Sequence, residues 1–402
     1  MYSCYDIIDY QINYCTVEIA LEHFNKLMMS FDKGFGDENK RYVVVLREGD
    51  KAYSFPDNYA GACYNAEGKG KLNIYLTDDN IKPYLTVLDK EYVIFKKVDY
   101  SLNYLLETQK VISTYHKELF IKENSIIQKN NNIEIYVKEG HVKDFYTLIE
   151  RFGIDANLVT VKEYKNDNSL IDDIEDDTLH SDFIRGDVAS TNAIHTAVAG
   201  KRISCTGNGY QSVGFNAYHY ISQEYGVVTA AHGFLNVQPY QTISIGTVIN
   251  VVGNTYSYYV DGSNCDAAFV PFSNQDNWAS TRLFMGGNTS GFINSSNAVT
   301  SSLENTTVYK YGATTGEKSG IITSAYSDLE FSDTGYYITD MFKANNYNDN
   351  GDSGGPVGIR TGSTNPHYLS ILGITTGMEY AYHNTYATKM SNVINRLHVV
   401  LY

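Results

Sequence analysis

The sequence predicts an α+β region followed by an all-β domain, with an acidic linker between them. Before about residue 170, apolar residues recur at helical spacing in three segments, and short strand-like runs lie between these segments. After about residue 200 helical periodicity nearly vanishes, and short β-prone runs recur between turns rich in Gly, Ser, Thr and Asn. Many short strands at roughly even spacing are typical of a β-sandwich or a β-barrel.

The first half divides into two expected small units, residues 1–98 and 99–165. Its helices are expected within 17–28, 101–119 and 139–153, the last of them ending at Gly153, and its strands at 41–46, 71–76, 91–98 and 132–137. Residues 166–200 form the expected linker, because their dense negative charge and low apolar content indicate exposure. The all-β domain is then expected over 201–402, and residues 389–401 suggest a closing helix.

Composition limits the function classes. Of 402 residues 43% are hydrophobic and 19% charged, which indicates a folded protein. A net charge of −15 argues against nucleic acid as partner. Five scattered cysteines, none in a CxxC pair, predict neither a disulfide scaffold nor a metal site. No apolar run is long enough for a membrane span, and residues 1–15 lack the features of a signal peptide, so either another export route or an upstream start is needed for secretion.

The strongest chemical signal is the segment NGDSGGPV, residues 350–357. A serine hydroxyl needs a base to become a nucleophile, and the oxyanion that forms needs backbone donors aimed at it. Glycines on both sides of Ser353 permit the tight turn that such a hole requires. Asp352 is expected to be buried and to need a partner. The motif alone also has a bland explanation, since GDSGG can arise by chance in a chain rich in Gly and Ser.

A histidine and an aspartate complete the candidate constellation. His232 ends the apolar run GVVTAAH and has small neighbours, a setting that the other nine histidines lack. Asp266 directly precedes the apolar run AAFVPF, where a carboxylate is costly unless paired. Such an aspartate is usually a strand-start residue, but the order His, Asp, Ser with these flanks favours a triad.

These motifs resemble the chymotrypsin-like serine proteases. TAAH, DAAFV and GDSGGP carry the resemblance, and the runs at 212–217, 308–324 and 372–377 are similar to those of the bacterial branch of streptogrisins and α-lytic protease. The resemblance covers most of residues 205–390. It implies a double six-stranded β-barrel and a serine endopeptidase that cleaves proteins or peptides and uses water without a cofactor.

Roles follow from the resemblance. Ser353 is the implied nucleophile, His232 the general base and then acid, and Asp266 the carboxylate that orients the histidine. The backbone N–H groups of Gly351 and Ser353 form the implied oxyanion hole. A homologue that has lost catalysis and uses the barrel for binding is the alternative, and the intact triad argues against it.

The upstream half resembles the long pro-region of the same branch, which assists folding and then inhibits the protease until cleavage. The segments 55–78, 98–112 and 125–153 carry this looser resemblance. It implies a secreted zymogen with a processing site in the linker, and with its own pro-region as an intramolecular inhibitor. A permanently attached accessory domain is the alternative.

Some residues depart from the family pattern. Thr376 stands where a serine usually helps to hold the aspartate, and a threonine hydroxyl can do the same. Lys310 resembles an arginine that pairs with the aspartate of GDSGG, so we expect an Asp352–Lys310 ion pair, with an exposed strand lysine as the alternative. Gly233 stands in place of a disulfide cysteine.

A second disulfide of the family is also replaced, here by Tyr309 and Ser319, and neither Cys205 nor Cys265 has an evident family partner. The expected stability therefore comes from packing.

The specificity pocket is expected to include Tyr347, Thr375, Thr376, Gly377 and Met378. Tyr347 lies six residues before Ser353, where trypsin-like enzymes have an aspartate, which argues against Arg or Lys substrates. Asp349 leaves that preference open. Thr375 stands where glutamate-specific relatives have a histidine. Apolar or small side chains are the favoured substrates.

Overall fold

The computed structural model describes most of the chain. The described residues are 19–20, 22–31, 35, 55–65, 71–164, 195–205, 209–234, 242–245, 248–251, 255–273, 275, 278–279, 283–286, 289–331, 334–361, 367–379 and 384–402. The expected strand at 41–46 and all but the end of the expected linker therefore lie outside them.

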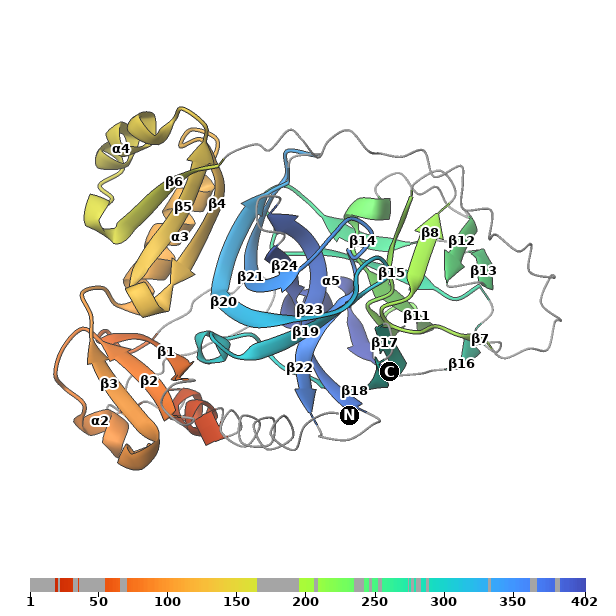
Figure 1. Cartoon of the computed structure of the whole chain (residues 1–402), viewed down its shortest axis with the longest axis horizontal. Coiled ribbons are helices and arrows are strands. Elements are labelled where there is room, and N and C mark those ends of the chain that lie inside the picture. Colours follow the sequence, from red (N-terminus) through yellow and green to blue (C-terminus); the bar gives the residue numbers. More distant parts are fainter. Residues whose placement is uncertain are drawn as a thin grey trace, which may run out of the picture.

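The first half contains two small α+β units that lie one above the other in Figure 1. In each unit an antiparallel pair is extended by a parallel strand after a helical crossover. The first has β1 (Tyr59–Asn65), β2 (Lys71–Leu76), α2 (Lys82–Leu85) and β3 (Val93–Lys97). The second has α3 (Leu102–Thr114), β4 (Ile121–Ile127), β5 (Asn132–Lys138), α4 (Val142–Arg151) and β6 (Val159–Tyr164). A further helix occupies 22–31.

Six strands of the second half close into a barrel. Each strand pairs with the next in the order β19-β20-β21-β24-β23-β22, and β22 pairs back onto β19. A closed ring has no unpaired edge, and its interior is filled by apolar side chains of alternate residues. The strands are β19 (Thr307–Gly312), β20 (Gly316–Glu330), β21 (Tyr337–Tyr347), β22 (Pro356–Thr361), β23 (His367–Glu379) and β24 (Asn384–Lys389).

The strands β8 to β15, together with β25 from after the barrel strands, form two sheets that share one apolar core. One has the order β14-β15-β11-β10-β25 and the other β13-β12-β8-β9. Their bounds are β8 (Arg202–Cys205), β9 (Tyr210–Ser212), β10 (Phe215–His219), β11 (Glu224–Thr229), β12 (Thr242–Ile245), β13 (Val248–Val251), β14 (Tyr256–Tyr259), β15 (Asp266–Pro271) and β25 (Val399–Leu401).

Shorter elements complete this half. They are β7 (His195–Thr196), β16 (Trp278–Ala279), β17 (Leu283–Gly286), β18 (Thr289–Ser296) and α5 (Met390–Leu397). An all-β half after an α+β region is the predicted fold class, and the prediction is confirmed. The expected closing helix is α5, which is followed by β25. Within the described ranges, no helix has the length and apolar character needed to cross a membrane.

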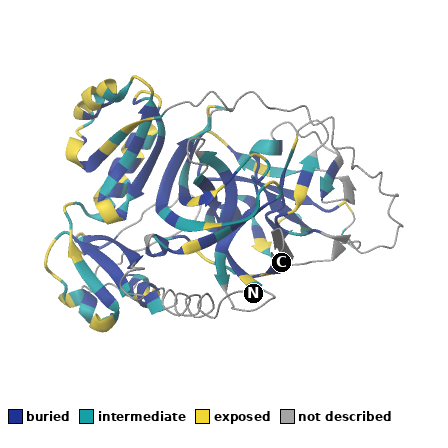
Figure 2. Cartoon of the chain, in the orientation of Figure 1, coloured by how far each residue is buried: buried dark blue, intermediate teal, exposed yellow. Residues whose placement is uncertain are grey.

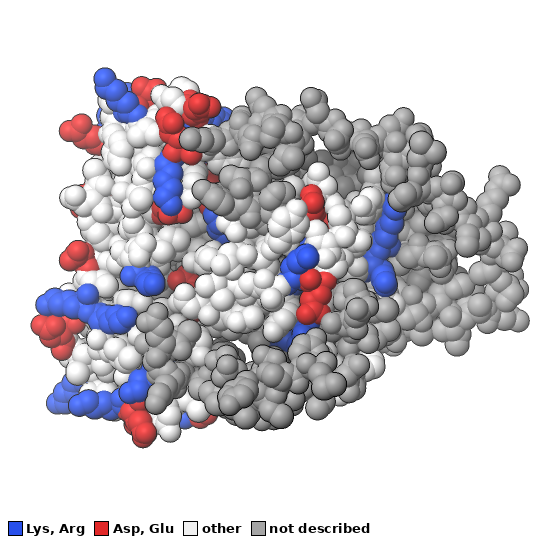
Figure 3. Space-filling model, viewed as in Figure 1, with Lys and Arg blue, Asp and Glu red and all other residues white. Residues whose placement is uncertain are grey.

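The two halves are joined by a continuous sheet. β4 pairs antiparallel with β20, so that β5 and β6 extend the barrel wall outward, and one apolar core runs through both (Figures 1 and 2). Ion pairs cross this junction, among them Lys343–Glu123 at 2.7 Å and Lys122–Glu330 at 2.5 Å. Charges of both signs intermingle over the described surface on the face shown in Figure 3, without an extended basic area.

A buried carboxyl lies at the same junction. Glu304, 3% exposed, accepts hydrogen bonds from the backbone N–H groups of Ala325 in the barrel and Gln128 in the first half. Burial raises the pKa of Glu304 to about 8, although these two donors lower it in part. The folded protein therefore holds a proton at this carboxyl that the unfolded chain releases above its ordinary pKa of 4.5.

Raising the pH is therefore expected to destabilise the fold through Glu304. Because its pKa is higher in the folded state, its contribution is fully present below pH 4.5 and is lost as the pH rises through about 8. The difference corresponds to about 5 kcal/mol at most. Urea unfolding of Ser353→Ala protein at pH 5.5 and pH 9 measures it. Glu304→Gln in the same background is expected to reduce the pH dependence, and an unchanged dependence would contradict this assignment.

Candidate active site

His232 and Asp266 meet at the ends of two paired strands. β11 pairs with β15, and β11 is followed by Ala230, Ala231 and a short 3-10 turn that begins at His232. Asp266 is fully buried at the start of β15, and its carboxylate accepts hydrogen bonds from the N–H groups of Ala231 (2.8 Å) and His232 (3.0 Å). His232 Nδ1 lies 2.7 Å from the second carboxylate oxygen. Because a carboxylate can only accept, Nδ1 carries the proton, and Nε2 is left as the base.

The loop that carries Ser353 is held in a conformation that favours glycine. Gly351 and Gly354 have φ values of +89° and +85°. A Cβ atom on Gly351 would also lie 2.5 Å from the ring of Tyr210. The N–H groups of Gly351 and Ser353 have no hydrogen-bond partner among the described residues. Two backbone donors are thus available beside the serine hydroxyl, as an oxyanion hole requires.

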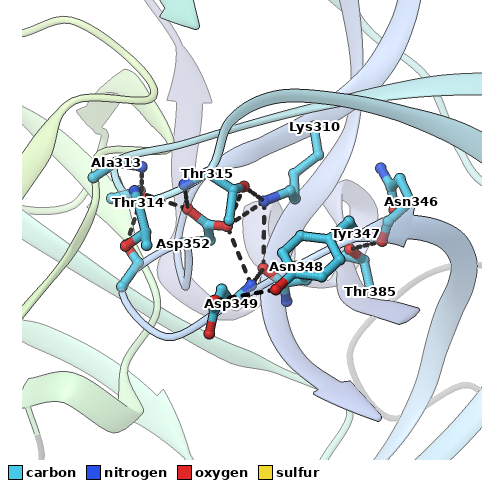
Figure 4. Close-up of polar contacts among 12 residues, drawn as sticks. Lys310, Ala313, Thr314, Thr315, Asn346, Tyr347, Asn348, Asp349, Asp352 and Thr385 are labelled. Carbon is cyan, nitrogen blue, oxygen red and sulfur yellow. Dashed lines mark hydrogen bonds and ion pairs between the residues drawn. The ribbon is translucent and has the colours of Figure 1, made fainter. Parts of the chain in front are cut away.

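The Asp352 side chain holds this loop in place through several polar contacts (Figure 4). Its carboxylate forms an ion pair with Lys310, and both side chains are fully buried. It also accepts hydrogen bonds from the N–H groups of Thr314 and Thr315, each at 3.0 Å, and from the Thr315 hydroxyl at 2.6 Å. Burial lowers the pKa of Lys310, and the charge of Asp352 opposes this. The lysine is therefore not an exposed strand residue.

Packing and hydrogen bonds occupy both positions where family disulfides are replaced. A Cβ atom on Gly233 would lie 2.7 Å from Gln211 Oε1, so the Gln211 side chain fills the space beside the histidine turn. Its amide donates to the Ala230 carbonyl at 2.9 Å. Tyr309 and Ser319 face each other across β19 and β20, and the Arg360 guanidinium lies 4.0 Å from the Tyr309 ring centre. Cys265 is a buried free thiol.

A cavity of about 100 Å³ connects the candidate base and nucleophile with the predicted pocket. The candidate base His232 and the candidate nucleophile Ser353 both line it. The other lining residues are Leu329, Glu330, Phe331, Asn348, Asp349, Asn350, Thr376, Gly377 and Met378 of the second half, and Tyr164 of the first half. Thr376, Gly377 and Met378 thus lie where they were expected, on β23.

Tyr347 and Thr375 do not line this cavity. The Tyr347 side chain is 43% exposed and donates to Asp349, and Thr375 is fully buried, its backbone paired with Gly354 and Gly355. The structure thus places both residues outside the lining of this cavity.

Thr376 differs from its expected role. Its hydroxyl lies 2.7 Å from the hydroxyl of Thr388 on β24, and no hydrogen bond between its hydroxyl and the Asp266 carboxylate is found. The Thr388 hydroxyl accepts a hydrogen bond from the Asp266 backbone N–H at 3.2 Å. The two threonines, both almost wholly buried, thereby connect the barrel to the strand that carries the aspartate.

Replacing Thr388 with valine is expected to lower activity more than binding. The change leaves the buried N–H of Asp266 without its acceptor, which costs about 1–3 kcal/mol, and loosens the position of the carboxylate against His232. The expected result is a lower kcat with little change in KM, measured on a peptide substrate. Thr388→Ser keeps the hydroxyl and is expected to restore kcat. Equal activity of the Val and Ser variants would contradict this role.

The chain is similar in fold, over about half its length, to bacterial chymotrypsin-like serine proteases. Protease A of Thermobifida fusca is 21% identical over 52% of this chain and 98% of its own, with a TM-score of 0.40. The protease of Nocardiopsis is 23% identical over 52% and 99% (TM-score 0.41), and the α-lytic protease homolog N4 is 16% identical over 52% and 100% (TM-score 0.40). Neither a known family profile nor a curated protein matches the sequence.

Several residues of the site were not anticipated from the sequence. They are Gln211, Thr314, Thr315, Phe331 and Thr388. Gln211 had an indirect signal. Because Gly233 stands in place of a disulfide cysteine, the partner of that cysteine on a neighbouring strand must be replaced as well. Thr314 and Thr315 lie within the run 308–324 that resembles the bacterial branch, although no role was predicted for them. Thr388 has no such signal, because hydroxyl residues are frequent throughout this half of the chain.

Proposed function

We propose that the chain is a serine endopeptidase that is synthesised with its own inhibitory pro-region. Ser353 attacks the carbonyl carbon of the substrate, and His232 Nε2 takes the hydroxyl proton. Asp266 keeps the imidazole in the tautomer with Nδ1–H and stabilises the imidazolium that forms. The N–H groups of Gly351 and Ser353 donate to the oxyanion. The same histidine then gives its proton to the leaving amine, and water hydrolyses the acyl-enzyme.

The observation that carries the proposal is the pairing of an oriented histidine with two unpartnered backbone donors in one cleft. A binding module needs neither a buried carboxylate behind a histidine nor a loop with two left-handed glycines. These features, which together cost stability, therefore favour catalysis over the binding alternative.

The inhibitory role rests on the position of Tyr164. This residue ends β6, the last described strand of the first half, and lines the same cavity as His232 and Ser353. The last described residue of the first half therefore lies in the candidate cleft, where it obstructs the binding of a substrate polypeptide. An accessory domain without an inhibitory role gives no reason for this position.

Labelling with a fluorophosphonate probe tests the proposal, because the probe reacts only with an activated serine. Wild-type protein is expected to be labelled and Ser353→Ala protein is not. An unlabelled wild type is retested after limited proteolysis that digests the first half together with residues 165–194, because a cut in the linker alone leaves the first half paired to the barrel through β4 and β20. If the cleaved protein also stays unlabelled, the endopeptidase proposal is wrong and the binding alternative is the better one.

A further inference from the structure

The leaving-group side of the cleft is bordered by β9. The Ser212 N–H donates to the Ser353 carbonyl at 2.7 Å, and its hydroxyl donates to the Gly351 carbonyl at 2.8 Å. On the other side of the loop, the Gly354 N–H donates to the Thr375 carbonyl of β23 at 2.7 Å. Because the pocket residues lie on β23, the acyl half of a substrate lies on that side, and the leaving half faces β9.

Tyr210 of β9 is fastened to the nucleophile loop on this side. Its hydroxyl lies 3.1 Å from the Thr314 hydroxyl, which donates to the Asn350 carbonyl at 2.6 Å. Its ring packs against Gly351, since a Cβ on that glycine would lie within 2.5 Å of it. The ring therefore forms a fixed surface directly beside one donor of the candidate oxyanion hole.

An arginine covers that ring. The Arg202 guanidinium carbon lies 3.9 Å from the ring centre of Tyr210, in cation–π contact. Arg202 is exposed and forms no ion pair with any residue in the part of the chain that the structure describes. A planar cation held on a rigid aromatic ring, with its donors available, matches the geometry of a carboxylate.

The chain itself supplies a complementary sequence. Tyr164 lines the cavity, and after Lys165 and Asn166 the sequence becomes strongly acidic: Asp167, Asp172, Asp173, Glu175, Asp176, Asp177 and Asp182, without a lysine or arginine between residues 166 and 182. A polypeptide with Tyr164 in the cavity that continues past Ser353 would have its first acidic residue, Asp167, at the third position on the side of Tyr210 and Arg202.

We propose that Arg202, stacked on Tyr210, forms a leaving-group subsite that selects polypeptides with acidic residues just after the cleaved bond. The proposal rests on the endopeptidase function and names its substrate class. The acidic linker is then the first such substrate, cleaved within its own chain. An exposed ion pair of this kind changes kcat/KM by at most about fivefold, and the effect decreases as salt screens it.

Internally quenched peptides test the subsite. One series keeps the same acyl half and carries Asp, Asn or Lys at the first three positions after the cleaved bond. Purified protein, as it stands after its own processing, is expected to cleave the Asp peptides about two- to fivefold better than the Asn peptides and the Lys peptides worst. The preference is expected to shrink between 20 mM and about 500 mM salt.

Variants separate this subsite from general charge effects. Arg202→Gln is expected to remove the preference and Arg202→Glu to reverse it, while Lys201→Gln, an exposed neighbour, leaves it unchanged. Cleavage of the Asn peptide without any preference for Asp, or a preference that survives in Arg202→Gln, overturns the subsite and leaves the endopeptidase function intact. A protein that cleaves no peptide and takes no fluorophosphonate label overturns both.

Discussion

Replacing Lys310 with methionine is expected to destabilise the protein by about 3–5 kcal/mol and to abolish cleavage. The change leaves the fully buried Asp352 without its cation, and an uncompensated buried charge costs this much. Asp352 sits between Gly351 and Ser353, so a displaced carboxylate also displaces both candidate oxyanion donors. Urea unfolding of Ser353→Ala protein, with and without Lys310→Met, measures the stability without interference from self-cleavage.

Two controls define the result. Lys318 lies directly opposite Lys310 on the neighbouring strand and is only half-buried. Its replacement by methionine is expected to change the free energy of unfolding by less than about 0.5 kcal/mol. Asp352→Asn combined with Lys310→Met removes both charges and is expected to recover part of the loss. A Lys310→Met protein that unfolds and cleaves like its parent would show that the ion pair does not hold the loop.

Replacing Asp266 with asparagine is expected to lower kcat by about 10⁴-fold with little loss of stability. The amide keeps the size of the carboxylate, but its NH₂ group favours the wrong histidine tautomer and gives no charge to stabilise the imidazolium. Hydrolysis of a peptide substrate by the purified variant measures this effect.

Asp328→Asn is the matched control for this variant. Asp328 is also buried, but it lies on β20 among Ser113, Asn124 and the Asp340 N–H, outside the cleft. Its replacement is expected to leave kcat within a few-fold of wild type. If both asparagine variants kept wild-type kcat, Asp266 would not be part of the catalytic apparatus.

The nucleophile loop was readable from sequence because its requirements are local. A turn with two left-handed residues and a close backbone approach demands glycines at fixed offsets from Ser353, and these appear directly in the chain. His232 and Asp266 were readable for a related reason, since each lies next to a buried apolar strand: His232 follows β11, and Asp266 begins β15. Lys310 and Asp352 are 42 positions apart in the sequence, and only the family resemblance suggested their contact.

The junction between the halves was not predicted, because its strand is polar. β4 buries Glu123, Asn124 and Ser125, which reads as a loop when partners are unknown. Lys343 and Ser327 of the barrel satisfy two of these side chains, so the polar residues of this strand have their partners in the other half of the chain. The β propensity of a segment does not indicate a strand when contacts with distant parts of the chain determine that the strand forms.

The cavity walls were predicted only in part. Thr376, Gly377 and Met378 follow from position on one strand, but Phe331 and Tyr164 reach the cleft from distant segments. Phe331 follows directly after β20, and its ring stacks on the His232 ring with the two ring centres 6.3 Å apart. No spacing in the sequence encodes that approach.

The most direct test of a self-maturing protease is the intact mass of purified wild-type protein compared with Ser353→Ala. We expect the wild type to separate into two fragments through a cut after Tyr164 and before residue 195, and Ser353→Ala to keep its full 45.1 kDa. Two chains of full length, or the same cut in both proteins, would contradict the account, because processing would then be absent or due to another protease.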